Sequence, residues 1–186
     1  MFDKRRKIFR TWRVDDVEIP ERSQIYNLAP QHLNTINVES LTSYINRLAE
    51  EHCVTVGKFI SQIIAPRLSL LQKQDVKHNI YAHIFKSCYS INGTSKLAND
   101  VVDVLNSLTL NNKRKLTLID FPGLISVSDI KRIRHWCPIC FETYRQNQEP
   151  IYEKLIWFLK NVTICVDHKI PLQSTCNHCG FQQKYL

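Results

Sequence analysis

The sequence predicts a mainly α-helical protein in which a helical domain precedes a small cysteine-rich module. Two amphipathic stripes between residues 40 and 64 predict a pair of short helices joined by a tight turn. Cysteine and histidine residues recur in pairs after residue 136, at the two-residue spacing that is typical of metal sites. We therefore divide the chain into a basic tail (1–22), a helical domain (23–135) and a metal-binding module (136–186).

The first predicted helix spans residues 40–51, because apolar side chains recur there at every third or fourth position. They are Leu41, Tyr44, Ile45 and Leu48. Thr55 can cap a second helix, which Pro66 ends because proline has no N–H to continue the hydrogen-bond ladder. The apolar side chains of this second helix are Val56, Phe59, Ile60, Ile63 and Ile64.

These two helices are typical of a helix-turn-helix motif, in which the second helix enters the major groove of DNA. Small Ala49 stands where the helices would cross, whereas Cys53 occupies a turn position at which glycine is favoured. A general helical hairpin has the same stripes and is the alternative. In a helix-turn-helix, the outward residues that meet phosphates or base edges would be Lys58, Ser61, Gln62 and Arg67.

Three further helical segments are predicted before the cysteine pairs. Residues 68–90 have a mixed helical pattern, and residues 95–108 form an amphipathic helix that Thr94 or Ser95 can cap.

The third segment is a short helix that begins at Ser128 and leads into the first cysteine pair. We expect it to direct Ile130 and Ile133 inward. Its outward residues would be Lys131, Arg132 and Arg134.

The formal net charge of +8 is unevenly distributed along the chain. Within the tail, residues 1–13 hold Lys4, Arg5, Arg6, Lys7, Arg10 and Arg13 against Asp3 alone. A second cluster, in a predicted loop, consists of Lys113, Arg114 and Lys115, and the third is the short basic helix after Ser128. Such clusters favour a polyanion, because bound counterions are released when phosphates are neutralised. For residues 1–13 taken alone, a solvated segment without a partner is an equal alternative.

Three pairs of metal-ligand residues follow residue 136, each with two residues between the partners. They are Cys137 and Cys140, Cys165 and His168, and Cys176 and Cys179. Because two-residue spacing lets both side chains of a tight turn reach one ion, we predict a structural Zn²⁺ site. Disulfides are disfavoured by the odd count of seven cysteines and by the charged residues 1–7, which do not resemble a secretory signal. A redox centre is disfavoured by the cysteine–histidine pair. Cys53 and Cys88 lack partners and are predicted to be small core residues.

The spacing leaves two ligand sets open. The first two pairs can close a Cys₃His site, which leaves Cys176 and Cys179 as half of a second site. Alternatively, the first and third pairs form a Cys₄ ribbon and the middle pair is spare. In the Cys₃His arrangement, either the chain is a fragment of a longer protein or the last pair binds metal poorly. Zinc binding supplies roughly 10–16 kcal/mol in small modules, so metal binding and folding should be coupled.

Two classes of protein are disfavoured by composition. The four glycines, Gly57, Gly93, Gly123 and Gly180, are never clustered, whereas phosphate-cradling loops need several close together. Nucleotide-hydrolysing and dinucleotide-binding enzymes are therefore disfavoured. No apolar run approaches the roughly 18 residues of a membrane span, so we expect a soluble, cytoplasmic protein without a membrane partner.

Several segments together resemble the TniQ/TnsD family of bacterial transposition proteins. The first are residues 38–44, the run Arg47, Leu48 and Ala49, and His52. The others match the zinc region of that family in the same order, at residues 136–140, 155–157, 162–168 and 176–180. The resemblance covers about residues 23–180. Family members commonly carry a fourth cysteine pair, which is absent here.

The resemblance implies a non-catalytic, DNA-associated target selector in the bacterial cytoplasm. Proteins of this family link a chosen DNA site to the AAA+ ATPase TnsC, which licenses the transposase. Some read an attachment site directly, and others are brought to their target by an RNA-guided CRISPR effector. The absent cysteine pair makes the second zinc site incomplete and favours a truncated chain.

Two other functions compete with this one. A helix-turn-helix transcription regulator would use the same motif, but such proteins usually dimerise and the chain has no coiled-coil heptads. A zinc hydrolase or deaminase needs an open coordination position and an acid–base glutamate near a ligand. His168 is followed by Lys169 and Ile170, and cysteine-rich ligand sets favour a structural role.

Overall fold

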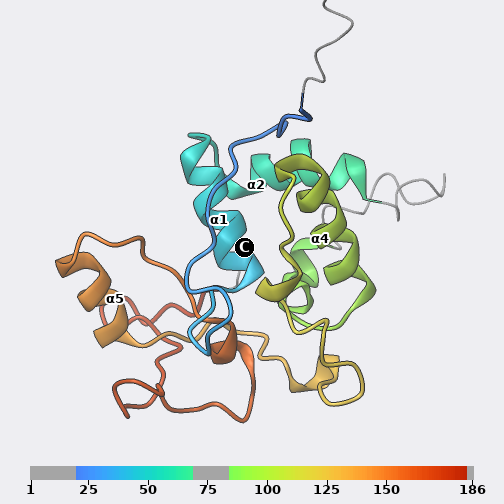
Figure 1. Cartoon of the computed structure of the whole chain (residues 1–186). Coiled ribbons are helices and arrows are strands. Elements are labelled where there is room, and N and C mark those ends of the chain that lie inside the picture. The colour runs from blue at the N-terminus through green and yellow to red at the C-terminus, as the bar shows by residue number, and fades with distance from the viewer. Residues whose placement is uncertain (1–19, 69–83, 184–186) are drawn as a thin grey trace, which may run out of the picture.

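The computed structural model describes residues 20–68 and 84–183 (Figure 1). This part of the chain is mainly helical, as the sequence predicts, and its only β-type pairing consists of four isolated bridges. None of its helices is long and apolar enough to cross a membrane. The helical elements in chain order are α1 (Leu41–Glu51), α2 (Val56–Phe59), η2 (Ile60–Ile64), η3 (Ala65–Arg67), η6 (Cys88–Asn92), α4 (Lys96–Thr109), η7 (Arg114–Leu116), η8 (Val127–Asp129), α5 (Pro138–Gln146) and η9 (Leu155–Phe158).

Helix α1 begins where the sequence predicts, because Ser40 caps it. Ser40 Oγ accepts a hydrogen bond of 3.2 Å from the Ser43 N–H. A second N–H of the first turn, that of Thr42, donates to the buried Asn92 Oδ1 at 3.0 Å. The four apolar side chains predicted for the inner face are fully buried. Asn92 therefore ties the start of α1 to η6.

The second helix begins at Thr55, its predicted cap, and its backbone hydrogen-bond pattern changes before the helix ends. Thr55 Oγ1 accepts a backbone N–H of the first turn at 3.3 Å. From there α2, η2 and η3 follow one another without a gap and pass from α-helical through π-helical to 3₁₀-helical bonding. Pro66 explains the change, since it has no N–H to offer Gln62. The preceding Ala65 N–H bonds the Ile60 carbonyl, five residues back.

The turn between α1 and α2 corrects one prediction. Cys53 has a φ of 54°, the left-handed conformation that glycine favours, which agrees with its predicted place in the turn. Its side chain is exposed, so the prediction that Cys53 is a core residue is wrong. Cys88 is buried as predicted, and so is Ala49.

Helix α4 confirms the predicted segment 95–108 with Ser95 as its cap. Ser95 Oγ accepts the Ala98 N–H at 3.1 Å. The apolar face of this helix is buried, including Val101 and Leu105. For the predicted segment 68–90, residues 69–83 lie outside the described residues, and the segment ends in the 3₁₀ turn η6.

The prediction of a short helix that begins at Ser128 is wrong. The chain forms a single 3₁₀ turn, η8, which Ser126 caps together with Asp129, and it then becomes extended. The Lys131 N–H donates to the Phe158 carbonyl at 2.8 Å, so the backbone is held by a distant segment. Lys131 is buried and Ile133 is exposed, which reverses the orientation predicted for both side chains.

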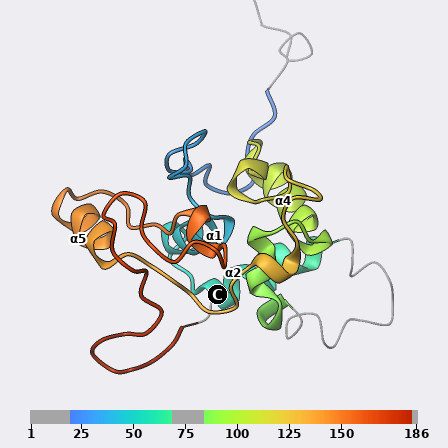
Figure 2. The same ribbon diagram turned by 90° about the horizontal axis from the view of Figure 1, so that it is seen from below.

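Two hydrophobic cores meet along one segment of the chain. α1 lies between α4 and α5 in both views (Figures 1 and 2). The helical core fills the space around α1, α2 and α4, and a second cluster surrounds α5. Residues 152–158 serve both, because Leu155 and Phe158 pack into the helical core while Tyr152 and Trp157 pack into the second cluster.

The same segment is bonded to the start of α1. The Ser40 N–H donates to the Glu153 carbonyl at 2.9 Å, and the Leu155 N–H donates to the Val38 carbonyl at 2.8 Å. Between them, Glu39 forms an isolated antiparallel bridge with Lys154. The chain around α5 is therefore joined to the helices around α1 by backbone hydrogen bonds as well as by apolar packing.

Glu39 is a fully buried carboxylate whose hydrogen bonds are satisfied. Its Oε2 accepts from Arg47 Nη1 at 2.6 Å and from the Gln31 N–H at 3.1 Å, and its Oε1 accepts from Ser43 Oγ at 3.1 Å. Burial raises the pKa of Glu39, and the Arg47 guanidinium opposes that rise. Arg47 is itself mostly buried, so neither charge is well hydrated.

We predict that Arg47→Ala lowers the free energy of unfolding by about 3 kcal/mol, because it leaves the Glu39 carboxylate buried without its cation. The double variant Glu39→Gln with Arg47→Ala should recover at least half of that loss, since the amide needs no counter-charge. Urea denaturation of both variants measures the difference. Equal stabilities of the single and double variants would contradict the ion-pair interpretation.

Candidate metal centre

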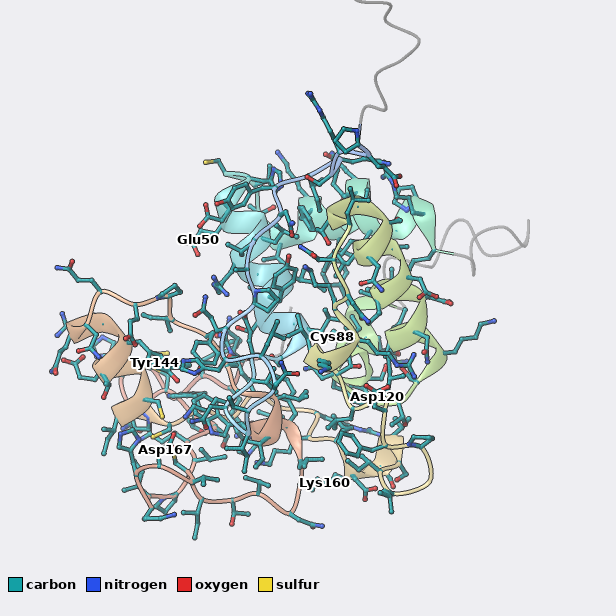
Figure 3. The ribbon with its side chains drawn as sticks, in the orientation of Figure 1. Glu50, Cys88, Asp120, Tyr144, Lys160 and Asp167 are labelled. Carbon is teal, nitrogen blue, oxygen red and sulfur yellow. The ribbon has the colours of Figure 1, made fainter. Side chains whose placement is uncertain are left out.

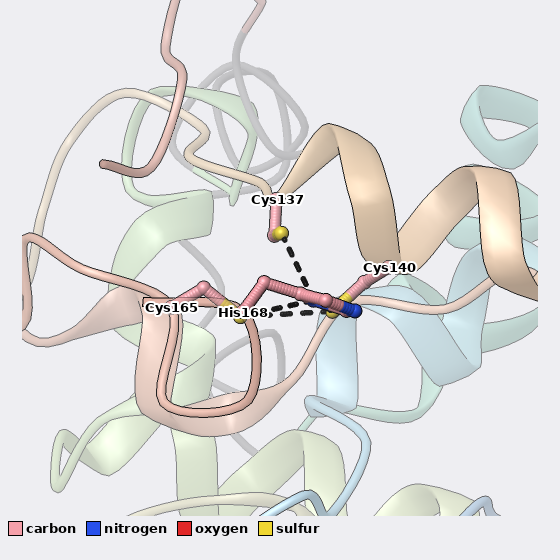
Figure 4. A group of neighbouring side chains, drawn as sticks. All are labelled: Cys137, Cys140, Cys165 and His168. Atoms are coloured by element: carbon pink, nitrogen blue, oxygen red, sulfur yellow. Dashed lines mark hydrogen bonds between the residues drawn. The ribbon is translucent and has the colours of Figure 1, made fainter. Parts of the chain in front are cut away.

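The first cysteine pair lies at the start of α5. Cys137 is the residue before the helix, and Pro138 occupies the first helical position, where a missing N–H costs nothing. The Phe141 N–H donates to the Cys137 carbonyl at 3.2 Å, which closes the first turn. This turn places Cys137 Sγ and Cys140 Sγ on the same side of the helix end (Figure 4).

The second pair lies in a tight turn. The Lys169 N–H donates to the Cys165 carbonyl at 2.9 Å, and the Cys165 N–H donates to the Ile170 carbonyl at 2.8 Å. Lys169 adopts a φ of 57°, so the chain reverses directly after His168. Ile164 and Pro171 bridge on either side and close the loop.

A short backbone pairing holds the two turns together. Trp136 and Gln173 exchange hydrogen bonds of 2.9 and 2.8 Å. The residue before the first pair is thereby fixed to the chain that follows the second pair. The ligand turns approach each other because of this pairing and because both pack into the cluster around Trp157.

Four side chains converge on one point. Cys137, Cys140, Cys165 and His168 place their ligand atoms within 4.8 Å of one another. Cys140 Sγ and Cys165 Sγ are 3.7 Å apart. His168 Nδ1 lies 3.3 to 3.7 Å from the three sulfur atoms.

These separations match the edges of a tetrahedron around a zinc-sized ion. Bond lengths of about 2.3 Å to sulfur and about 2.0 Å to nitrogen place two sulfurs about 3.8 Å apart, and sulfur and nitrogen about 3.5 Å apart. The cluster therefore fits a single divalent ion with three thiolates and one imidazole. With all four positions taken by the protein, no coordination site is left for a substrate.

Burial shapes the chemistry of the thiols. All three cysteines are buried, and burial raises the pKa of Cys137 and of Cys140, because a thiolate there loses its hydration. Cys165 is also buried, but the backbone N–H groups of Asp167 and His168, helped by the neighbouring side chains, lower its pKa to about 7. Coordination to a cation would compensate the two unfavourable thiolates.

A buried cation lies beside the cluster. Lys154 is almost fully buried, and its Nζ donates to the carboxylate of Asp167, the residue before His168. Burial alone would lower the pKa of Lys154, but the Asp167 ion pair and the nearby Cys140 sulfur outweigh it and raise the pKa. A divalent ion with three thiolates and a neutral imidazole carries one net negative charge. Lys154 would stabilise that charge even while paired with Asp167, because its ammonium group favours the thiolate form of Cys140 and opposes the rise that burial causes in the pKa of that thiol.

The third pair lies outside the cluster. Cys176 and Cys179 form a turn of their own, in which the Gly180 N–H donates to the Cys176 carbonyl at 2.9 Å and Gly180 has a φ of 70°. Cys176 is half-buried and Cys179 is exposed. Within the described residues, the first two pairs form the group that could hold a metal ion, and the third pair has no part in it.

The predicted DNA-binding residues of the second helix are mostly at the surface. Lys58, Gln62 and Arg67 are exposed, and Ser61 is half-buried. Arg67 differs from the others because it lines a cavity of about 280 Å³ together with Asp100 and Asp103. A phosphate there would meet two carboxylates, so Lys58 and Gln62 are the better placed residues for DNA.

Two residues of the other basic clusters, Lys113 and Lys131, are inside the protein, and for Lys131 this corrects the predicted outward orientation. Lys113 lies 5.0 Å from the centre of the Tyr44 ring, and burial lowers its pKa. Lys131 donates to the Trp157 and Val162 carbonyls at 3.0 and 2.5 Å, and burial lowers its pKa to about 8. Neither ammonium group can reach a phosphate without unpacking the core.

The remaining members of these clusters are nearer the surface. Arg114 forms an ion pair with Asp120, and Arg134 forms one with the buried Glu153. Arg132 is exposed over the Tyr89 ring, at 5.4 Å from its centre. The last member, Lys115, is also exposed.

A model of the TniQ family matches residues 30–172, which includes α1, α2, α4, α5 and the whole four-residue cluster. A search of curated proteins gave no match. The family match spans most of the 186 residues and leaves the third cysteine pair outside. The chain therefore belongs to the TniQ family.

Proposed function

We propose that this chain is a non-catalytic, DNA-associated adaptor that selects a transposition target site and recruits or caps the AAA+ regulator TnsC. Membership of the TniQ family supports the role, because that family is associated with transposition and DNA and is generally an accessory to catalysis.

We further propose that Cys137, Cys140, Cys165 and His168 hold a structural Zn²⁺ ion. The observation that carries this proposal is the buried cluster of four ligand atoms with tetrahedral separations. A metal ion whose four coordination positions are all filled by protein ligands stabilises the fold and has no open position for catalysis. This agrees with a non-catalytic adaptor. Lys154 and Asp167 lie beside these ligands and are paired with each other.

For the DNA contact we propose the helix-turn-helix formed by α1 and α2. The two helices are joined by a turn with a left-handed residue, and small Ala49 is buried in α1. Lys58 and Gln62 are exposed on the second helix, one turn apart. A cationic and an amide side chain at that spacing suit a phosphate and a base edge, respectively.

Elemental analysis should find about one zinc per chain in the wild-type protein. Cys140→Ser should lose the metal, because Cys140 is one of the four converging ligands. Cys176→Ser is the matched control and should retain about one zinc, since its sulfur lies outside the cluster. Loss of zinc in the control would favour the Cys₄ arrangement instead.

Lys154→Met should weaken zinc binding by about tenfold, because it removes the cation that offsets the negative charge of the metal–ligand group. Competition against a chromophoric chelator measures the affinity. Lys160→Met, at an exposed position, provides a control of equal charge change. An unchanged affinity in Lys154→Met would show that Lys154 serves packing alone.

The purified chain should join the cognate AAA+ ATPase on DNA and show no turnover of its own. Failure of the wild-type chain to associate with the ATPase in such a reconstitution would refute the adaptor role.

Lys58→Glu should weaken DNA binding by about tenfold and reduce the slope of log affinity against log salt by about one. Lys96→Glu, at an exposed position on α4, has the same charge change and should bind DNA normally.

A further inference from the structure

A groove runs between α1 and the chain that follows α5. It consists of two adjoining cavities, of about 440 Å³ and about 170 Å³, which share Arg47, Glu50 and Ile151. The larger cavity is lined on one side by the last turn of α1 and on the other by residues 148–151. The smaller one leads inward to Phe141 and Glu153. Figure 3 shows that the Glu50 side chain extends from α1 on the side away from α4.

The groove carries negative charge. Glu50, Glu51 and Glu149 line it, all three are exposed, and no ion pair among the described residues involves them. Its two arginines do not cancel this charge. Arg47 is bound to the buried Glu39, and Arg134 is bound to Glu153.

A buried acceptor lies at the inner end of the groove. Glu153 is 1% exposed, and its Oε2 has no hydrogen-bond partner. An unpaired buried carboxylate oxygen is costly, and a ligand with an N–H donor would satisfy it. The unpaired Glu153 oxygen is a separate observation from the three surface glutamates, and both favour a ligand that carries a cationic N–H group.

The groove also has apolar walls. Ile151 is 50% exposed, and Pro150 and Phe141 line the cavities beside it. An occupant that combines a cation with an apolar side chain would therefore cover both kinds of surface. Lysine and arginine beside an aliphatic or aromatic residue give that combination in a polypeptide.

We propose that this groove docks a basic segment of a protein partner, with a lysine or arginine directed towards Glu153 and an apolar neighbour on Ile151. The assignment rests on the proposed function only in taking the partner from the targeting complex. DNA is a poor occupant, because three unpaired carboxylates would repel its phosphates. The proposed protein-binding groove is therefore a different surface from the proposed DNA-binding helix.

The docking chemistry can be tested without knowing the partner. The full chain, labelled with ¹⁵N and loaded with zinc, is titrated with the capped pentapeptide KIRFK, and amide shifts are followed by NMR. We expect saturable shifts at the amides of the groove, in residues 50–51, 148–149 and 151–153. The capped peptide EIEFE should leave these amides unmoved. An absence of shifts with KIRFK, or shifts spread evenly over the surface, would overturn the proposal.

Charge reversal supplies the matched variants. The double variant Glu50→Lys with Glu149→Lys should weaken KIRFK binding by about tenfold, because it replaces attraction by repulsion. Glu21→Lys with Asp103→Lys changes the net charge equally at positions outside the groove and should bind the peptide as the wild type does. Equal weakening in both double variants would mean that net charge alone attracts the peptide, which would also overturn the proposal.

The same variants separate this proposal from the adaptor role. If the wild-type chain binds the ATPase on DNA and the groove variant does so equally well, the groove is not the docking site. If the wild-type chain does not bind the ATPase, the adaptor role fails while the peptide result still decides the groove. A short DNA duplex that shifts the groove amides would assign the groove to nucleic acid instead.

Discussion

The pairing of residues 38–40 with residues 153–155 is the constraint on which the remaining structure depends. It fixes the segment 152–158 against the first turn of α1, and that segment then serves two cores at once. Trp157 faces the cluster that contains the ligand cysteines, and Phe158 faces the helices. A metal ion bound in the cluster would therefore stabilise the helical domain as well as its own module, because the two share backbone bonds and apolar surface.

Local patterns were sufficient for the helices. Ser40, Thr55 and Ser95 each combine a capping side chain with an apolar stripe, and each begins a helix as predicted. Prediction failed where distant segments compete with local pattern. After Ser126, pairing with residues 158–160 draws the chain into an extended form and buries Lys131. The π-helical turn before Pro66 was also missed, since periodicity alone does not distinguish one winding from another.

The candidate metal site was predictable in composition but not in its surroundings. Two-residue spacing identified every residue of the cluster, yet it left two pairings open, and the convergence of the first two pairs depends on the Trp136–Gln173 bridge. Lys154 lies outside every motif, so its position beside Cys140 could not be read from the sequence. The only local signal was an acidic residue, Asp167, inside the second ligand turn.

The segment shared by the two cores also governs where this chain can change its length. An insertion between residues 152 and 158 would move side chains of this segment away from the core that each one fills, and one within residues 38–40 would misplace the start of α1. The connection at residues 121–124 packs into neither core, because its side chains are exposed and Leu124 is 81% accessible to solvent. Related chains are expected to vary in length there and to keep a constant count of residues on either side of Lys154.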